Sequence, residues 1–178
     1  ARTSASLDLE EVVEAAVDQL GQLVTFEGYS LVLFEDHTVS RVISSRPESE
    51  ALLGLTVDDV GDTSVDRLAS EKVSVLRLPD ELGPLAANQA IPDLAGAVVI
   101  ALPSDTGLLG ALSLVSTQPD TFEDVDRRFL ERIGTQLSLA IKNAQLYDEI
   151  KQMHLGNLKA LSSALNAKDY YTLGHAAR

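Results

Sequence analysis

Histidine and carboxylate side chains are the groups in this sequence that could hold a metal or transfer a proton. The chain has three histidines, His37, His154 and His175, and no cysteine. Metal-dependent phosphodiester hydrolysis needs several His and Asp side chains that hold two cations about 3.5 to 4 Å apart. Here the histidines are widely separated, and none of them is followed by an aspartate. We therefore predict no catalysis of this kind by the chain itself.

Other residue types that could do chemistry favour structural roles. The absence of cysteine excludes disulfides, thiolate zinc sites, cysteine nucleophiles and cofactors tethered through a thioether. Glu10, Glu11 and Glu14 follow one helix in the manner of a solvated surface, which argues against paired-carboxylate catalysis. Gly107 and Gly110 precede a strand rather than a helix, so we interpret them as turn residues and not as a phosphate cradle.

Length and charge narrow the class of protein further. The 178 residues fit one domain with a little extra, and 14 basic against 27 acidic residues give a net charge of −13. Because this charge repels phosphate backbones and anionic headgroups, we expect no nucleic-acid partner and no membrane contact. No apolar run approaches a membrane span, so we expect a soluble, cytoplasmic chain. Because it begins at Ala1 rather than Met, we also expect a fragment of a longer protein.

The first 45 residues predict a helix followed by two strands. Apolar residues recur every three or four positions up to Val24, and Asp8 with Glu11 has the form of a capping box that predicts a helix start. The segments 29–35 and 38–45 then predict an antiparallel hairpin, in which His37 occupies the turn.

The middle of the sequence predicts the rest of an antiparallel sheet. Strands are predicted at 73–78, 97–102 and 110–116, with a hairpin loop at 103–107 and a helical turn at 64–71. The stretches 46–62 and 80–93 read as turns and short helices. The fold class is therefore α+β, with a central sheet of about five to six strands flanked by helices.

A long helix is predicted from Glu123 to about Leu165. One apolar stripe is expected to lie on the sheet: Phe129, Ile133, Leu137, Ala140, Ala144 and Tyr147. A heptad-like seam continues from Leu146 to Leu165 and predicts a partner helix, hence a homodimer through the terminal helices. His154 lies in this seam, either as a helix-interface residue that reaches water or as a pH-sensitive coupling residue.

The order of motifs after Ala97 carries a family resemblance. A strand that contains Gly110 is followed by Phe122 and Asp126 in a Phe-x-x-x-Asp helix start, and the helix ends in Ala140-Ile141-Lys142-Asn143-Ala144-Gln145-Leu146-Tyr147. This ordered set resembles a GAF domain, the small-molecule sensor module of signalling proteins. The resemblance covers about residues 7–150, which we take as a sensor domain at 1–150. Without cysteine, it excludes the branches that attach a tetrapyrrole or reduce sulfoxides.

A second resemblance lies in residues 158–178, within a predicted linker segment at 151–178. The run Ala167-Lys168-Asp169-x-Tyr171-Thr172-x-Gly174-His175-x-x-Arg178 resembles the first motif of HD-GYP and related HD-type phosphohydrolase domains. In that family the histidine that matches His175 is a metal ligand, alongside His and Asp residues further along the chain. The resemblance implies a divalent metal in the HD-type domain of a longer parent protein, and no cofactor in this chain.

The GAF resemblance also implies where a ligand would bind. In that family the ligand lies between the sheet and its connecting segments, which here contain the candidate residues Ser44, Arg46, Arg77, Asn88, Gln89, Ile91 and Leu94. The polar members could orient an anionic or purine-like ligand against the two apolar ones, although they could equally satisfy loop backbone. We expect a sensor of an unknown small molecule that controls a cyclic dinucleotide phosphodiesterase; the alternative is a ligand-free dimerisation module or spacer.

Overall fold

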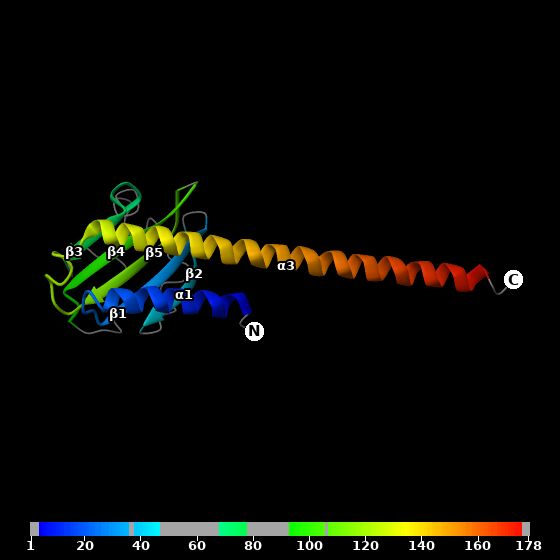
Figure 1. The fold of residues 1–178 in the computed structure, drawn as a ribbon, viewed down its shortest axis with the longest axis horizontal. Coiled ribbons are helices and arrows are strands. Elements are labelled where there is room, and N and C mark those ends of the chain that lie inside the picture. The colour runs from blue at the N-terminus through cyan, green and yellow to red at the C-terminus, as the bar shows by residue number, and fades with distance from the viewer. Residues whose placement is uncertain (1–3, 36–37, 47–67, 78–92, 106, 176–178) are drawn as a thin grey trace. The chain divides into compact units, whose positions relative to one another are not determined.

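The computed structural model describes residues 4–35, 38–46, 68–77, 93–105 and 107–175, and it describes no side chains at 4–8, 44–46 and 164–175. In these residues the elements follow in the order α1, β1, β2, β3, β4, β5 and α3 (Figure 1). The chain divides into two compact units, Ala1–Ile141 and Lys142–Arg178. The first unit contains the whole sheet.

Helix α1 spans Ser4–Gly21 and buries one apolar stripe. Leu9, Val13, Val17 and Leu20 are buried at the three-and-four spacing that the sequence predicts, whereas Val12, which the same pattern includes, is 39% exposed. The predicted capping box at Asp8 is wrong, because the helix already begins at Ser4. Ala5 and Leu7 are strong helix formers, so the helix continues beyond Asp8 towards the N-terminus.

Five strands form one antiparallel sheet in the order β2-β1-β5-β4-β3. Their bounds agree with the predicted strands within a few residues: β1 Gly28–Glu35, β2 Thr38–Arg46, β3 Val73–Arg77, β4 Gly96–Ser104 and β5 Gly107–Ser116. The antiparallel sheet with helices confirms the α+β fold class that the sequence predicts.

The hairpin between β4 and β5 is tighter than the sequence suggests. The predicted loop at 103–107 is wrong, because β4 continues to Ser104 and β5 begins at Gly107. Pro103 is accommodated within β4 at a register shift, where a residue without an N–H disturbs the ladder least. Gly107 has a φ of 137°, a conformation that side chains with a Cβ rarely adopt.

The chain before β3 is helical from Leu68 to Glu71, which confirms the described part of the helical turn predicted at 64–71. The amide of Lys72 donates to the Leu68 carbonyl at 2.8 Å and closes this turn. The irregular stretches predicted at 46–62 and 80–93 fall almost wholly outside the described residues.

Helix α3 spans Arg127–His175, so the predicted start at Glu123 is wrong. Asp126 is the N-cap instead, since its Oδ1 accepts a hydrogen bond from the Arg128 amide at 2.9 Å. Phe122, four residues earlier, is only 1% exposed and lies in the core, as its place in the Phe-x-x-x-Asp step predicts.

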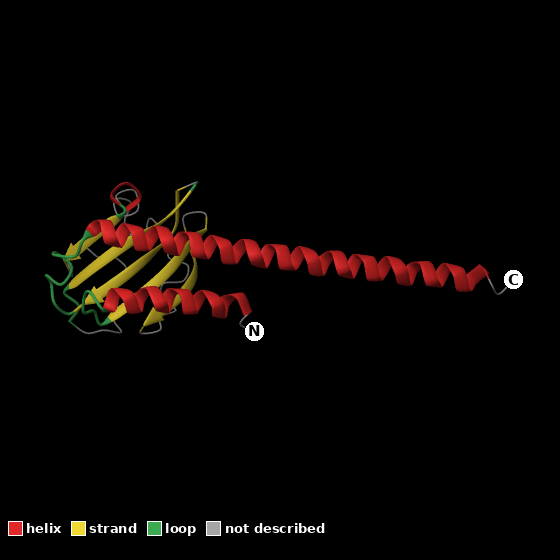
Figure 2. Ribbon diagram, viewed as in Figure 1, coloured by secondary structure: helices red, strands yellow, loops and turns green. Residues whose placement is uncertain are grey.

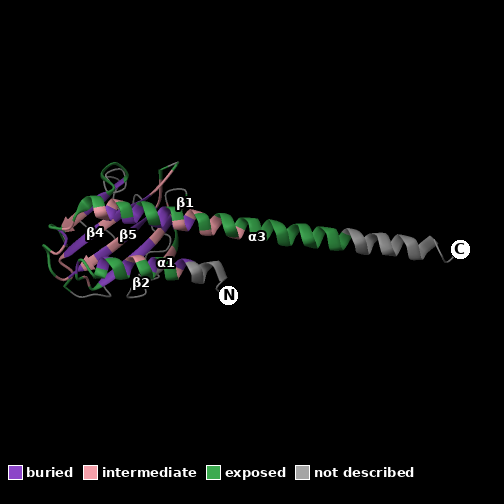
Figure 3. Cartoon of the chain, viewed as in Figure 1, coloured by how far each residue is buried: buried purple, intermediate pink, exposed green. Residues whose placement is uncertain are grey.

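The stripe of α3 that is buried differs from the predicted one. The buried residues are Leu130, Ile133, Gly134, Leu137, Ser138 and Ile141, whereas Phe129 and Ala140 are half-buried and Tyr147 is 70% exposed (Figure 3). Ile133 and Leu137 of the predicted stripe are confirmed as buried, but the buried stripe runs through Leu130 and Ile141 instead of Phe129, Ala144 and Tyr147. Gly134 is at the closest approach, where an added Cβ would overlap the Ala101 carbonyl oxygen.

Helices α1 and α3 cover the same face of the sheet (Figure 2). We call it the helix-covered face, and its central row is Val73, Ile100, Leu112 and Leu31, which pair across β3, β4, β5 and β1. Ile100 lies next to Gly134 of α3, which identifies the side on which this row lies. All four residues are at most 1% exposed and form the centre of the core.

Candidate functional site

The opposite side of the sheet, which we call the second face, carries a row of serines. Because successive side chains alternate between faces, the neighbours of the buried row point the other way. Ser30 pairs with Ser113, Ser113 pairs with Val99, and Val99 pairs with Ser74. We call Ser30, Ser113 and Ser74 the serine row. It crosses four adjacent strands, β1, β5, β4 and β3, in the middle of the sheet.

Two hydroxyls of the serine row are buried without a hydrogen-bond partner. Ser30 is 9% exposed and Ser74 is 5% exposed, and neither Oγ has a partner in the structure as described. A buried hydroxyl that lacks a partner costs roughly 1 to 3 kcal/mol relative to one that is satisfied. Native proteins contain few such groups, and those that persist are often found where a ligand or water completes the bond.

The surroundings of the serine row are apolar. Ala101 and Ala111 form a cluster with Leu68, against which Val32, Phe34, Val99 and Leu108 pack. Ala97 lies on the other side of Val99 in β4 and is 1% exposed. Three alanines and three serines make a floor of small side chains in the middle of this face, whereas the helix-covered face carries Leu and Ile. The serine hydroxyls are the polar groups of this floor to which a ligand could hydrogen-bond.

The structure places only some of the residues predicted to bind a ligand. Ser44 and Arg46 lie near the end of the edge strand β2, where their backbones pair with Leu31 and Tyr29. Leu94 is half-buried in the segment before β4. Asn88, Gln89 and Ile91 lie outside the described residues, so their part in a site stays a prediction.

Arg77, a further predicted ligand residue, is held by two carboxylates. Its guanidinium forms an ion pair with Asp120 at 2.9 Å and a hydrogen-bonded ion pair with Glu123, 46 residues away in the sequence. Both carboxylates belong to the turn that precedes α3. Strand alternation places Arg77 on the same face as Val73, away from the serine row. The contacts of Arg77 therefore connect β3 to the start of α3.

Arg46 and Arg77 are not brought together. They lie on β2 and β3, the opposite edge strands of the sheet. With about 4.8 Å between adjacent strands, four spacings separate their backbones by about 19 Å. A small ligand oriented by both guanidinium groups is therefore not what this geometry favours.

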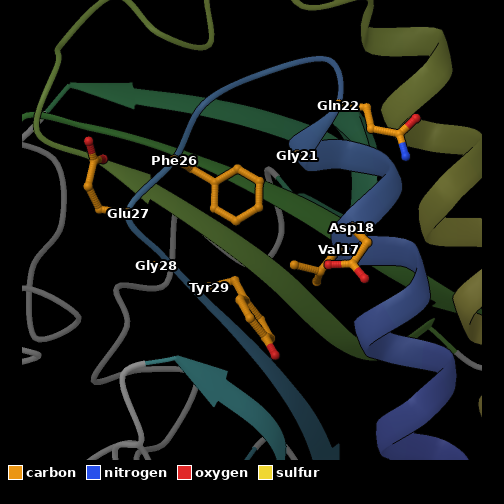
Figure 4. A pocket seen from close by; sticks show the side chains of 8 residues that line it. All are labelled: Val17, Asp18, Gly21, Gln22, Phe26, Glu27, Gly28 and Tyr29. Carbon is orange, nitrogen blue, oxygen red and sulfur yellow. The ribbon is translucent and has the colours of Figure 1, made fainter.

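A cavity of about 560 Å³ lies on the helix-covered side, between the end of α1 and the start of β1 (Figure 4). Its lining residues are Val17, Asp18, Gly21, Gln22, Phe26, Glu27, Gly28 and Tyr29, and none of the predicted ligand residues is among them. The Glu27 carboxylate already accepts hydrogen bonds from the Thr117 amide at 3.0 Å and from its hydroxyl at 3.2 Å. The cavity is open and polar. Its carboxylate acceptor, Glu27, is already bonded to Thr117 after β5 and so is not free for a ligand.

Helix α3 exposes large apolar side chains beyond the sheet-packed stripe. Among the described residues, six at the seam positions that the sequence predicts are about half exposed or more: Leu146, Tyr147, Ile150, Met153, Leu158 and Leu161. Leu139, outside the predicted seam, is 58% exposed. His154 is also exposed. The helix continues without interruption through Gly156 to His175. A solvent-facing apolar seam of this length is typical of a helix that pairs with another.

Metal binding and membrane insertion are the remaining points to settle for the described residues. No group of three or more His, Asp or Glu side chains in this part of the chain could hold a metal ion. Within the same residues, no helix combines the length and the apolar character that crossing a membrane would need.

The serine row is the feature that sequence reasoning missed. Each serine interrupts an apolar strand, as in Tyr29-Ser30-Leu31 and Leu112-Ser113-Leu114. A single serine in an apolar strand does not by itself indicate a ligand site. Its signal appears only when strand register shows that three of them lie in line.

The sequence profile of the GAF domain family matches residues 6–142. The chain therefore belongs to the GAF domain family, whose members are small-molecule sensor modules of signalling proteins. No curated protein sequence gives a significant match.

Several solved structures share the fold. The GAF domain of a two-component sensor histidine kinase from Bacillus halodurans is 22% identical, with a TM-score of 0.59, over 83% of this chain and 99% of that one. A GAF domain/HD domain protein from Geobacter sulfurreducens is 16% identical, with a TM-score of 0.61, over 82% and 99%. A free methionine-R-sulfoxide reductase from Thermoplasma acidophilum is 10% identical, with a TM-score of 0.58, over 79% and 96%. At these identities the likeness concerns the fold alone.

Proposed function

We propose that this chain is a regulatory sensor that binds a small molecule on the second face of its sheet. The observation that carries the proposal is the pair of buried, unpartnered hydroxyls of Ser30 and Ser74 on one face of a GAF fold. A ligand that accepts or donates hydrogen bonds there would remove the cost of both groups. We propose no catalysis by this chain, and no metal or other cofactor in it.

Purification under gentle conditions tests this proposal. We expect native mass spectrometry of the chain to show a retained small molecule that is lost on denaturation. A matched variant, Ser30→Ala with Ser74→Ala, is expected to retain less of it. Ser138→Ala is the control, because Ser138 is equally buried but already donates to the Gly134 carbonyl at 2.9 Å. Equal retention by both variants would contradict a site at the serine row.

Helix α3 provides a route from the sensor to an effector. Arg77 connects β3 to the turn before α3 through Asp120 and Glu123, and α3 then runs unbroken to His175. If a ligand prefers one of two arrangements of β3 and this turn, it biases the helix. Couplings of this kind are typically about 1 to 3 kcal/mol, enough for a several-fold change in output.

We also propose that the chain forms a homodimer through its terminal helices. The support is the exposed apolar seam of α3, in which Leu158 is 64% and Leu161 is 62% exposed. Sedimentation at tens of micromolar is expected to show a dimer that Leu158→Asp with Leu161→Asp converts to a monomer. Lys159→Ala changes an exposed residue of the same helical turn and is expected to leave the dimer intact. A wild-type monomer would contradict this part of the proposal.

The proposed effector is a metal-dependent HD-GYP-type phosphohydrolase that follows in a longer protein. The support is the motif from Ala167 to Arg178, which lies largely on α3, and the existence of a GAF domain/HD domain protein among the similar folds. In that setting His175 would be a metal ligand. We expect a longer protein with Mn²⁺ to hydrolyse cyclic di-GMP and this chain alone not to; loss of activity in His175→Ala without loss of folding would support the assignment.

The alternative function is a structural dimerisation module or spacer without a ligand. The exposed seam of α3 favours it equally, because dimerisation needs no bound molecule. The two functions separate in one comparison: a sensor retains or binds a small molecule in a serine-dependent manner, whereas a spacer dimerises with the same affinity whether or not Ser30 and Ser74 are present.

A further inference from the structure

In the described strands β1, β3, β4 and β5, the second face carries hydroxyls and apolar side chains. Its residues there are Gly28, Ser30, Val32, Phe34, Ser74, Leu76, Ala97, Val99, Ala101, Pro103, Leu108, Ala111, Ser113 and Val115. None of these side chains is ionisable. The guanidinium of Arg77, at the end of β3, is directed to Asp120 and Glu123 on the other side of the sheet.

Charge decides which class of molecule such a floor can hold. An ionised ligand that leaves water loses its hydration, and only an opposite charge or several strong donors repay that loss. In β1, β3, β4 and β5 the second face supplies three hydroxyls, which hydrogen-bond but carry no counter-charge. A neutral amide, carbonyl or hydroxyl group needs only such partners.

The spacing of the hydroxyls also limits the shape of a ligand that uses them. Ser30 and Ser113 are on neighbouring strands, about 5 Å apart, and Ser74 lies two strands beyond Ser113. The row from Ser30 to Ser74 is therefore about 14 Å long. The apolar side chain of Val99 lies between Ser113 and Ser74. A flat molecule with polar groups at its ends and an apolar middle matches this order.

We infer that the ligand of this sensor is an uncharged, flat molecule whose polar groups hydrogen-bond to Ser30, Ser113 and Ser74. This inference rests on the proposed function and narrows it, because the arginines in the sequence favour an anion whereas the geometry of the second face favours a neutral molecule. Val99 contributes an apolar contact between Ser113 and Ser74.

A fragment screen by saturation-transfer NMR tests the inference on the purified chain. The library has two equal halves of similar size and ring content, one uncharged and one carrying a single negative charge at neutral pH. We expect uncharged fragments to bind, and their affinity to fall about fivefold or more in Ser30→Ala with Ser113→Ala. Ser138→Ala is the control that keeps the affinity unchanged. A second variant, Ser113→Leu, fills the floor and is expected to abolish the same signals, with folding checked by circular dichroism.

The outcomes separate the inference from the function on which it rests. Anionic fragments that bind with the same serine dependence would overturn the neutral class and leave the sensor proposal standing. If no fragment of either half binds in a serine-dependent manner, both proposals fail, and water alone satisfies the hydroxyls. Serine-dependent binding confined to the uncharged half supports both.

Discussion

The two faces of one sheet differ in what their side chains can do. On the helix-covered face Leu31, Ile100 and Leu112 are completely buried, and α3 approaches so closely that it needs a glycine. On the second face, the alternate residues of the same strands are serines and alanines, and Val99 and Ser113 remain partly exposed. One face of the sheet therefore holds the domain together, and the other is left with small side chains and unpaired hydroxyls on which a ligand could act.

The close approach of α3 offers the largest test of this difference. Gly134→Ala adds a Cβ that would overlap the Ala101 carbonyl, which belongs to the backbone and cannot rotate away. We expect the free energy of unfolding to fall by about 3 kcal/mol or more, measured by urea titration. Gly156→Ala is the control in the same helix, because no atom lies within 4 Å of its added Cβ. It is expected to raise helix stability by about 0.5 to 1 kcal/mol.

Leu112→Ala against Val99→Ala compares the two faces directly. Leu112 is 0% exposed beneath the helices, so its truncation is expected to cost about 2 to 5 kcal/mol. Val99 is half-buried on the second face, so its truncation is expected to cost about 1 kcal/mol. Equal losses in urea unfolding would mean that both faces contribute alike to stability, and the distinction between them would fail.

Two equally buried serines are expected to respond with opposite signs. Ser74→Ala removes a hydroxyl that has no partner, so the chain freed of small molecules is expected to gain up to about 1 kcal/mol. Ser138→Ala removes a hydroxyl that donates to the Gly134 carbonyl and is expected to lose about 0.5 to 1 kcal/mol. Thermal unfolding of the two variants measures the difference. A loss in Ser74→Ala would show that its hydroxyl is already satisfied.

The smallest expected effect concerns Arg77. Its side chain is 64% exposed, so its ion pairs with Asp120 and Glu123 are worth little in water. Arg77→Ala is expected to lower stability by about 0.5 kcal/mol at low salt and by less at about 1 M salt. The same variant is expected to leave fragment binding at the serine row unchanged. Loss of that binding would return Arg77 to the ligand site.

Much of the fold follows from local patterns. The alternation in 29–35 and 38–45 predicts the hairpin, and the spacing from Leu9 to Leu20 predicts the buried stripe of α1. The errors occur at the ends of elements and along the buried stripe of α3. Asp126 rather than Glu123 starts α3, and the predicted stripe omits Leu130 and Ile141 as well as the small residues Gly134 and Ser138. Glycine and serine add little to a hydrophobic pattern, yet Gly134 lies where α3 comes closest to β4.

The candidate site was harder to predict than the fold. The GAF resemblance points to Arg77 because it begins a segment that connects strands near the sheet, but its carboxylate partner Glu123 lies in a turn 46 residues away. Ser30, Ser74 and Ser113 were overlooked because each one alone is an ordinary strand serine. Which residues form the serine row depends on which strands are neighbours. Strand order is a long-range property that local residue spacing does not encode.

The amino-acid sequence by itself determined the classes of chemistry that this chain lacks and the periodicity of its elements. Absence of cysteine and three isolated histidines are facts of composition, and periodicity is a local consequence of backbone geometry. Only the tertiary structure decided which serines stand in line, which glycine lets α3 approach the sheet, and which carboxylates hold Arg77. These depend on the order β2-β1-β5-β4-β3, because residues distant in sequence become neighbours only when strands pair.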